Sequence, residues 1–343
     1  MRAVTLRQHG GPEVLTLEDV PIPEIRPDEV LVRVRACALN HLDLWIRQGV
    51  RGYRINYPHI LGSDVTGVVE QAGELVTWVQ PGDEVIIAPG IGCGHCWACT
   101  HGLESQCPDY SILGAGPYWG GYAEFVRVPG VNVLPKPPGL SFEEAAAIPL
   151  VFQTAWHMLA KRAGVRPGET VLVQAGGSGV GSAAIQIARL FGARVITTAS
   201  SEAKLSKARE LGADETINYA ETDFVSAVRN FTEGRGVDVV FEHVGGEVFS
   251  KSIRILARGG RLVTCGATAG ATPEIDLRYI FTRQLAVFGV YMGSRADLLE
   301  VLQQVEAGRL RPVIDRVLPL EQAAEAHRIL ADRAQFGKVV LVP

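Results

Sequence analysis

Residues 170–191 read TVLVQ, then AGGSGVG, then SAAIQIARLF. The first five residues are typical of a buried strand, and the last ten are typical of an amphipathic helix. Glycines between the two let the backbone turn sharply and approach a pyrophosphate, whose charge is stabilised by the N–H groups at the helix start. The stretch therefore predicts a dinucleotide-binding unit, although a glycine cluster alone would also suit an ordinary tight turn.

The pattern that follows favours the dinucleotide interpretation, because strands and helices continue to alternate. Such alternation predicts an α/β fold with a doubly wound parallel sheet of the Rossmann type. We expect strands at Thr170–Gln174, Arg194–Thr198, Glu215–Ile217, Val237–Phe241, Arg261–Cys265 and Leu285–Val290, and helices at Gly179–Phe191, Glu202–Leu211, Asp223–Thr232 and Glu247–Ala257. The residues of the glycine loop expected to bind the cofactor are Gly176, Ser178, Gly179, Val180 and Gly181, with Ser178 in the place of the middle glycine of a strict G-x-G-x-x-G pattern.

The end of the second strand bears on the choice between NAD and NADP. An acid there would bind the ribose 2′-hydroxyl, but the expected position is Ala199. Ser200 can donate a hydrogen bond to a 2′-phosphate and Lys204 can pair with its charge, so NADP is favoured. The alternative is that Glu202 binds the ribose and Lys204 is an ordinary solvated helix residue.

The rest of the chain predicts a second domain that is rich in strands. Short apolar or alternating runs recur up to about residue 135, separated by turns such as Pro81–Gly82 and Gly120–Gly121, which suggests a small barrel or sandwich. The final segment, Arg295–Pro343, is too short for a core of its own. We therefore expect residues 1–150 and 291–343 to form one domain and residues 151–290 the dinucleotide-binding domain.

Four of the six cysteines lie close together, at Cys93, Cys96, Cys99 and Cys107. Their spacing, C-x2-C-x2-C-x7-C, lets one loop place four thiolates around a tetrahedral Zn²⁺. Four thiolates leave no open coordination position, so we expect a structural zinc in a lobe of about residues 92–108. An iron–sulfur cluster uses a different offset for its fourth cysteine.

Composition narrows the possible classes of function. Lys and Arg total 33 against 37 Asp and Glu, a formal net charge of −4, which does not suit a nucleic-acid-binding surface. The sequence has no apolar run of the length of a membrane helix and no signal-peptide core at its N-terminus. From this we expect a cytoplasmic protein without membrane or nucleic-acid partners.

Taken together, these features resemble the medium-chain dehydrogenase/reductase superfamily, which includes zinc alcohol dehydrogenases and quinone oxidoreductases. The resemblance covers nearly the whole chain. It rests on the cysteine lobe, the glycine loop, Leu61-Gly-Ser-Asp-Val-Thr-Gly-Val-Val69 and Phe336-Gly-Lys-Val-Val-Leu341. It implies a GroES-like β-barrel catalytic domain built from both chain ends, with the active site in the cleft beside the Rossmann domain.

The chain departs from the family's alcohol dehydrogenases where they hold a catalytic zinc. The corresponding positions carry Asn40, Ser63, Asp64 and Leu150, and Leu42 replaces the proton-relay hydroxyl. Asn, Ser and Leu do not make a usual zinc-ligand set. The segments around Asn40 and Asp64 look instead like the quinone oxidoreductase branch, which has no active-centre zinc and reduces quinones or enones with NADPH.

The resemblance also suggests individual roles. Tyr219 and Lys204 match positions that bind the 2′-phosphate, and Asn40 matches one that lines the substrate pocket. Further candidates are His41 at the pyrophosphate and Tyr57 as a donor in the substrate pocket. Asp43 matches a position behind the family's catalytic metal, and the alternative is that it only binds backbone groups. Around the nicotinamide the candidates are Thr154, His243, Val244, Gly266 and Ala267. The strand Leu285–Val290 would pair with its copy in a homodimer or homotetramer.

Three other classes of protein stay open on the sequence alone. The first is an alcohol dehydrogenase with an unconventional metal site at Asp64 and either His41 or His59. The second is an NADPH-binding protein without activity, and the third is a zinc-bearing nucleic-acid module.

Overall fold

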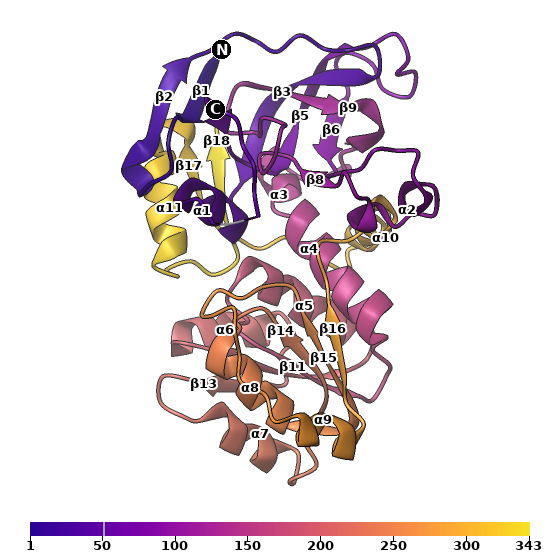
Figure 1. Ribbon diagram of the computed structural model, residues 1–343, viewed down its shortest axis with the longest axis vertical. Coiled ribbons are helices and arrows are strands. Elements are labelled where there is room, and N and C mark those ends of the chain that lie inside the picture. The colour runs from indigo at the N-terminus through magenta and orange to yellow at the C-terminus, as the bar shows by residue number, and fades with distance from the viewer. Residues whose placement is uncertain (51) are drawn as a thin grey trace. The chain divides into compact units, whose positions relative to one another are not determined.

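The computed structural model describes residues 1–50 and 52–343, and the chain divides into two compact units. Unit 1 comprises Met1–Val151 and Ser294–Pro343, and unit 2 comprises Phe152–Gly293. In Figure 1 the yellow C-terminal elements of unit 1 lie among its indigo N-terminal strands. The boundaries fall at 151/152 and 293/294, against 150/151 and 290/291 expected from the sequence.

Unit 2 is built on a six-stranded sheet with the order β13-β12-β11-β14-β15-β16. All five strand pairs are parallel. Its strands are β11 (Thr170–Val173), β12 (Arg194–Ala199), β13 (Glu215–Asn218), β14 (Val237–Glu242), β15 (Leu256–Thr264) and β16 (Ala286–Gly289). Its helices are α5 (Gly179–Leu190), α6 (Glu202–Glu210), α7 (Phe224–Phe231), α8 (Gly246–Arg254) and α9 (Leu277–Arg283), preceded by the π-helical segment His157–Ala163. This is the Rossmann arrangement that the alternating pattern predicts.

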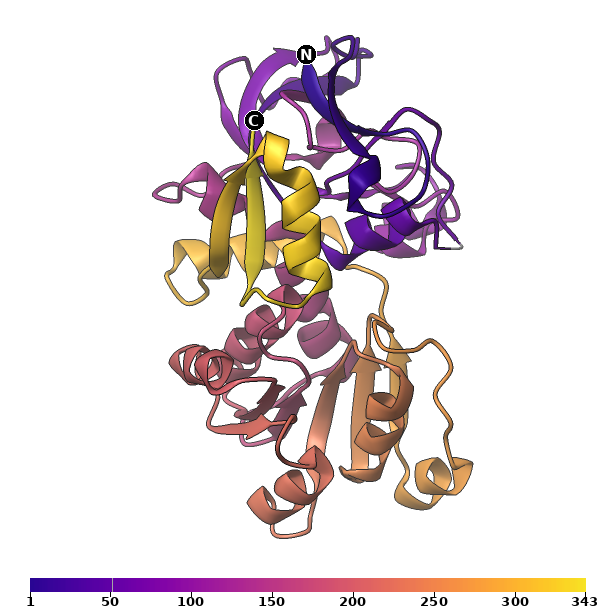
Figure 2. The same ribbon diagram turned by 90° about the vertical axis from the view of Figure 1, so that its left-hand side faces the viewer.

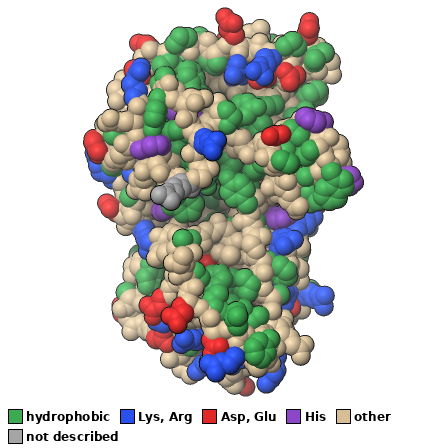
Figure 3. Space-filling view, viewed as in Figure 1, with side chains coloured by type: hydrophobic (Ala, Val, Ile, Leu, Met, Phe, Trp, Pro, Cys, Tyr) green, Lys and Arg blue, Asp and Glu red, His purple; other side chains and the backbone are tan. Residues whose placement is uncertain are grey.

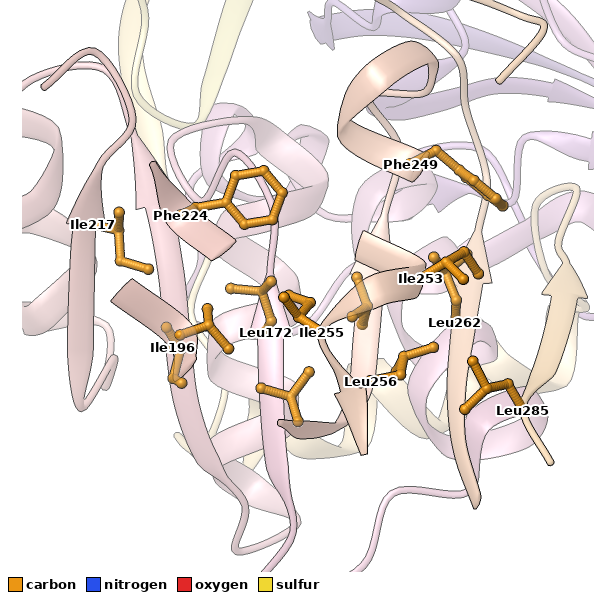
Figure 4. Close-up of a cluster of buried hydrophobic side chains, with 13 residues drawn as sticks. Leu172, Ile196, Ile217, Phe224, Phe249, Ile253, Ile255, Leu256, Leu262 and Leu285 are labelled. Carbon is orange, nitrogen blue, oxygen red and sulfur yellow. The ribbon is translucent and has the colours of Figure 1, made fainter. Parts of the chain in front are cut away.

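Apolar side chains of the strands and of α7, α8 and α9 form a buried core on one face of this sheet. Leu172, Ile196 and Leu262 project from three strands toward Phe224 of α7 and Ile253 of α8 (Figure 4). The helix expected over Glu247–Ala257 ends at Arg254, because Leu256 pairs with Val237 and begins β15. The alternating sheet and helix segments thus share one packed interior.

Unit 1 is organised around β3 (Glu29–Ala38), which pairs with β5 (Asp64–Ala72), β9 (Phe125–Pro129) and β18 (Lys338–Val342). The seven-stranded sheet also contains β6 (Glu84–Ile87), β10 (Val133–Pro135) and β17 (Ile314–Pro319). In the part of the chain that the structure describes, the end strands β10 and β17 are not paired with each other. The GroES-like domain is therefore an open sheet in its hydrogen bonding and not a closed barrel.

Smaller elements complete unit 1. A three-stranded sheet contains β1 (Arg2–Leu6), β2 (Leu15–Asp19) and β4 (His59–Ile60), and a two-stranded one contains β7 (Gly90–Ile91) and β8 (Ser111–Ile112). The helices are α1 (His41–Gln48), α2 (Trp97–Thr100), α3 (Phe142–Ala146), α10 (Arg295–Glu306) and α11 (Ala323–Ala331), while α4 (Pro149–Trp156) spans the boundary between the units. Figure 2 shows α11 lying along β17 and β18, which it contacts.

The pairing of β18 with β3 is the feature that shapes the site in unit 1. Val340 lies opposite Ala38 and Leu341 lies opposite Cys37 in an antiparallel register. Ala38 also lies opposite Asp64 on the other side. The first residue of β18, Lys338, is thereby brought to the end of β3, where Asn40 begins the turn into α1.

Two surface properties bear on partners. Within the described residues, no helix combines the length and apolar character needed to cross a bilayer. On the face drawn in Figure 3, acidic and basic side chains are interspersed with hydrophobic ones. A single-sign field of the kind that binds nucleic acid is not seen among the residues coloured there.

Candidate functional site

The cysteine lobe has the geometry of a four-thiolate metal site. The sulfur atoms of Cys93, Cys96, Cys99 and Cys107 all lie within 4.8 Å of one another. Bond lengths of ~2.3 Å around a tetrahedral Zn²⁺ place sulfur atoms about 3.8 Å apart, so the four fit one ion. Backbone N–H groups of Cys96 and Cys99 point at the preceding thiols, at 3.4 and 3.5 Å from Cys93 Sγ and Cys96 Sγ.

The glycine loop has the close approaches that a pyrophosphate-binding turn needs. A Cβ on Gly181 would lie 2.5 Å from the Ala175 carbonyl oxygen, and one on Gly176 would lie 2.2 Å from Thr197 Oγ1. Ser178 is the N-cap of α5, and its hydroxyl accepts from Gly181 N at 2.9 Å. The serine in place of the middle glycine therefore stabilises the helix start, while Gly179 and Val180 form its first turn.

The ends of β12 and β13 form the region that would receive the adenosine ribose. Tyr219 N donates to Ala199 O at 3.1 Å, which places the half-exposed tyrosine beside the exposed Ser200. Lys204 lies in the first turn of α6 and is partly buried. Glu202 accepts from Arg209 at 2.6 Å in an exposed ion pair.

Two loops at the carboxyl ends of β14 and β15 are fastened together by a buried carboxylate. Glu242 accepts from Val244 N, Gly245 N and Thr264 Oγ1 at 2.7, 2.8 and 3.1 Å. Ala269 N then donates to Val244 O at 2.7 Å. The loops that carry the candidates Val244, Gly266 and Ala267 are thus rigidly paired at the sheet edge where dinucleotides bind.

His243 links these loops to the glycine turn. Its Nε2 lies 3.0 Å from Gln174 O and 3.3 Å from Ser178 Oγ. Because a carbonyl oxygen only accepts, Nε2 carries the proton. Thr154, the remaining nicotinamide candidate, is buried on α4, and its hydroxyl lies 3.8 Å from Met292 Sδ.

In unit 1, Asn40, Asp64 and Lys338 form a buried polar cluster. The Lys338 ammonium donates to Leu39 O at 2.6 Å, to Asn40 Oδ1 at 2.6 Å and to Asp64 Oδ2 at 2.9 Å. The second oxygen of Asp64 accepts from Leu150 N at 2.8 Å. The ion pair is almost fully enclosed, with side-chain exposures of 4% for Lys338 and 0% for Asp64.

This cluster fixes the direction of the Asn40 amide. Its Oδ1 accepts from Lys338, and its Nδ2 donates to Asp64 Oδ2 at 2.9 Å. An amide nitrogen carries two hydrogens, so one N–H of Asn40 is not used by Asp64. Since Lys338 has no acceptor, the two ends of the amide cannot be exchanged without losing both contacts.

Asp43 lies directly behind this cluster. Its two oxygens accept from Asn40 N at 2.7 Å and from Gly62 N at 3.0 Å, which draws the end of β3 and the start of β5 together. Burial raises the pKa of Asp43 to about 6, against the lowering effect of those N–H groups. Asp43 is therefore a positioning group, and the sequence alone had left its role open.

A chain of buried polar groups continues from Asp43 to α11. Arg47 Nη1 lies 3.4 Å from His327 Nδ1, and His327 Nε2 lies 3.2 Å from the Tyr122 hydroxyl. Arginine only donates, so His327 accepts at Nδ1 and, being neutral, carries its proton on Nε2. Burial first, and then the Arg47 charge, lower the pKa of His327 to about 3. Burial and the nearby Asp43 carboxylate raise the pKa of Tyr122.

The remaining candidates of unit 1 lie around α1. His41 opens the helix, packs edge-on against Trp45, and has its pKa lowered by burial. Tyr57 is 45% exposed and lies edge-on to His9. His59 is buried and contacts Gly114 O at 3.0 Å. Among the described residues, neither His41 nor His59 belongs with Asp64 to a group of three or more side chains that could hold a metal ion.

Sequence reasoning missed Lys338, Glu242, Tyr122 and His327. The sequence does contain a signal for Lys338, which comes directly before the apolar residues 339–342 of one strand. A lysine in a buried strand needs an anionic partner. Glu242 likewise ends an apolar strand. For Tyr122 and His327, which lie 205 positions apart, the sequence offers no comparable signal.

Comparisons with known proteins agree with this geometry. A family model described as the alcohol dehydrogenase GroES-like domain matches residues 26–138, and one described as zinc-binding dehydrogenase matches residues 179–307. An NAD-dependent alcohol dehydrogenase of Sulfurisphaera tokodaii is 34% identical, with 100% of both chains covered. The quinone oxidoreductase of Homo sapiens is 32% identical over 100% of this chain and 98% of its own. A crystal structure of an NAD-dependent alcohol dehydrogenase is 52% identical, with a TM-score of 0.97 and 100% of both chains covered.

Proposed function

Because the chain belongs to the medium-chain dehydrogenase/reductase superfamily and is thus an NAD(P)-dependent oxidoreductase, we propose that it reduces quinones or α,β-unsaturated carbonyls. In this proposal the electron donor is NADPH, and zinc has only a structural role in the cysteine lobe. The alternative is the alcohol dehydrogenase activity that the names of two similar proteins carry.

One observation carries the proposal, namely that an ammonium group binds the carboxylate beside which a catalytic cation would lie. Lys338 contacts Asp64 Oδ2 at 2.9 Å, and Leu150 N contacts Asp64 Oδ1 at 2.8 Å. Oδ2 also accepts from Asn40 Nδ2, so a cation at that oxygen would have to displace one of its two donors, and a cation at Oδ1 would lie on a carboxylate whose charge Lys338 already balances. With Asn40 and Ser63 as the adjacent side chains, the set lacks the thiolates and imidazoles that zinc prefers.

The residues of this site suit a reaction in which negative charge develops on oxygen. When bound, the nicotinamide supplies the hydride. Hydride addition to a quinone or an enone moves charge onto its oxygen, and a fixed N–H donor stabilises that charge. Asn40 offers such a donor, since Lys338 and Asp64 hold its amide in one direction and leave one N–H available.

The preference for NADPH is supported by the end of β12. Ala199 offers no carboxylate to the ribose, and Glu202 is paired with Arg209 at 2.6 Å. Ser200 follows β12, Lys204 lies in the first turn of α6, and Tyr219 N donates to Ala199 O, so we propose that these three residues bind the 2′-phosphate. The phosphate would then be bound by a hydroxyl, an ammonium and the tyrosine.

We extend the proposal to self-association through β16. This strand is at the edge of the six-stranded sheet, and Val287 is 42% exposed on it. An edge strand can pair with its copy across a two-fold axis, which would give a homodimer or a larger homo-oligomer. Val287→Lys should then lower the mass measured by light scattering and leave the circular dichroism spectrum unchanged. An unchanged mass would contradict this interface.

Turnover against a substrate panel tests the proposal. NADPH and NADH oxidation would be measured with a small set of quinones and enones, and NADP⁺ and NAD⁺ reduction with primary and secondary alcohols. We expect NADPH-dependent reduction of quinones or enones and little oxidation of alcohols. Efficient alcohol oxidation, stimulated by added zinc, would support the dehydrogenase alternative instead.

A further inference from the structure

The hydroxyl of Ser63 is a buried polar group for which the structure shows no partner. Ser63 is 0% exposed, and its Oγ has no hydrogen bond to any described residue. A buried hydroxyl without a partner costs about 1–3 kcal/mol, so such a group calls for an explanation. Ser63 lies at the site in unit 1 and was not among the residues to which the sequence assigned chemistry.

The contacts of its two neighbours hold Ser63 close to Asn40. Gly62 N donates to the same Asp43 carboxylate that accepts from Asn40 N, at 3.0 and 2.7 Å. On the other side, Asp64 Oδ2 accepts from Asn40 Nδ2 at 2.9 Å. Ser63 is joined covalently to both Gly62 and Asp64, so its side chain starts within this hydrogen-bonded ring.

Nearly all other polar atoms of the cluster are already satisfied. The three ammonium hydrogens of Lys338 go to Leu39 O, Asn40 Oδ1 and Asp64 Oδ2. Both oxygens of Asp64 and both oxygens of Asp43 accept N–H groups. The donors left over are one N–H of Asn40 and the O–H of Ser63.

We propose that Ser63 is the second donor of a two-donor oxygen site, in which its hydroxyl and the remaining Asn40 N–H bind the same substrate oxygen. This inference rests on the proposed function and narrows it to substrates with an sp² oxygen conjugated to the carbon that accepts hydride. Two donors match the two lone pairs of a carbonyl or quinone oxygen. The two donors bind the oxygen more strongly once hydride addition makes it anionic. They therefore stabilise the transition state more than the bound substrate, and their effect is mainly on kcat.

The test uses substitutions at Ser63 in the full-length zinc-containing protein. Ser63→Ala removes the hydroxyl, and Ser63→Cys keeps a side chain of similar shape with a weak donor. Thr66→Val is the matched control, because the Thr66 hydroxyl is equally buried in β5 but donates to Phe142 O at 2.8 Å. The unfolding temperature of Ser63→Ala should be no lower than that of the parent, since no described group loses a hydrogen bond and an unpartnered buried hydroxyl is removed.

Two measurements are made on each variant. The first is kcat and KM for the quinone or enone that the parent protein reduces. The second is a titration with 4-nitrophenol in the presence of NADP⁺, where absorbance reports binding of the phenolate, a stable anionic oxygen on an sp² carbon. We expect Ser63→Ala to lower kcat about 10²-fold with little change in KM, and to weaken phenolate binding about tenfold. Ser63→Cys should behave similarly, and Thr66→Val like the parent.

The outcomes separate this inference from the proposed function. If the parent is active and Ser63→Ala has the kcat and the phenolate affinity of Thr66→Val, Ser63 does not bind the oxygen and the inference is overturned. If the parent reduces no quinone or enone, the proposed function fails. The phenolate titration then still decides whether Ser63 contributes to an oxygen site.

Discussion

The buried ion pair between Lys338 and Asp64 makes a strong prediction about stability. Lys338→Met keeps most of the aliphatic length of the side chain and removes the ammonium, which donates to three oxygens at 2.6–2.9 Å. Asp64 is then left as a fully buried carboxylate without its cation. Removing one partner of such a pair costs about 3–5 kcal/mol, a large part of the roughly 5–15 kcal/mol by which domains are stable.

Equilibrium urea unfolding of single and double variants measures this energy. Asp64→Asn alone leaves the ammonium unpaired and should also be destabilising. In the double variant neither charge is buried alone, so the loss should be clearly smaller than the sum of the two single losses. Arg328→Met removes an exposed ion pair with Glu325 as a control and should cost about 0–1 kcal/mol. A loss for Lys338→Met no larger than for this control, or strict additivity in the cycle, would refute the reasoning.

Three further predictions concern the nucleotide, the zinc lobe and pH. Lys204→Ala should raise KM for NADPH roughly 10- to 100-fold and leave KM for NADH nearly unchanged, with Lys207→Ala on the same helix as control; equal losses for both nucleotides would remove the assigned role. Cys93→Ser should lower the unfolding temperature strongly, because zinc binding contributes on the order of 10 kcal/mol to folding. The protein that still folds should keep its specific activity. Lost turnover at unchanged stability would show that the lobe is not merely structural. His327 stays neutral in the fold, with its pKa lowered to about 3, so the native protein loses stability relative to His327→Gln as pH falls from about 6.5 toward 3, by up to ~1.4 kcal/mol per pH unit. Urea unfolding of both proteins at pH 7, 6 and 5 measures this difference, and a constant difference would mean that His327 has an ordinary pKa.

The fold followed from the sequence where local patterns and tertiary packing agree. Strand β11, the glycine turn and α5 were expected within one or two residues, since periodicity and helix capping are both local. Helix α1 was not expected, although Asn40 caps it, Asp43 lies in its first turn and Gly49 ends it with a φ of 77°. The helix is only eight residues long, so its apolar periodicity is a weak signal beside its capping residues.

In the candidate site too, features set by local sequence were predicted and features set by long-range packing were not. The cysteine cluster is contiguous in sequence, and its spacing alone predicted four sulfur atoms that the structure places together. The environment of Asn40 depends instead on Lys338, which is 298 positions away and reaches it through the pairing of β18 with β3. Local periodicity does not show which distant strands pair or in which register. The position of the Lys338 ammonium beside Asp64 therefore could not be predicted from the sequence.

The most direct test of the account is the zinc content of the active protein, determined by elemental analysis after exhaustive dialysis and normalised to the chain concentration. We expect about one zinc per chain, bound by the four cysteines, together with full quinone or enone reduction. Two zinc ions per chain, with activity that falls as the more weakly bound one is removed, would contradict the account, because the account gives zinc only a structural role in the cysteine lobe.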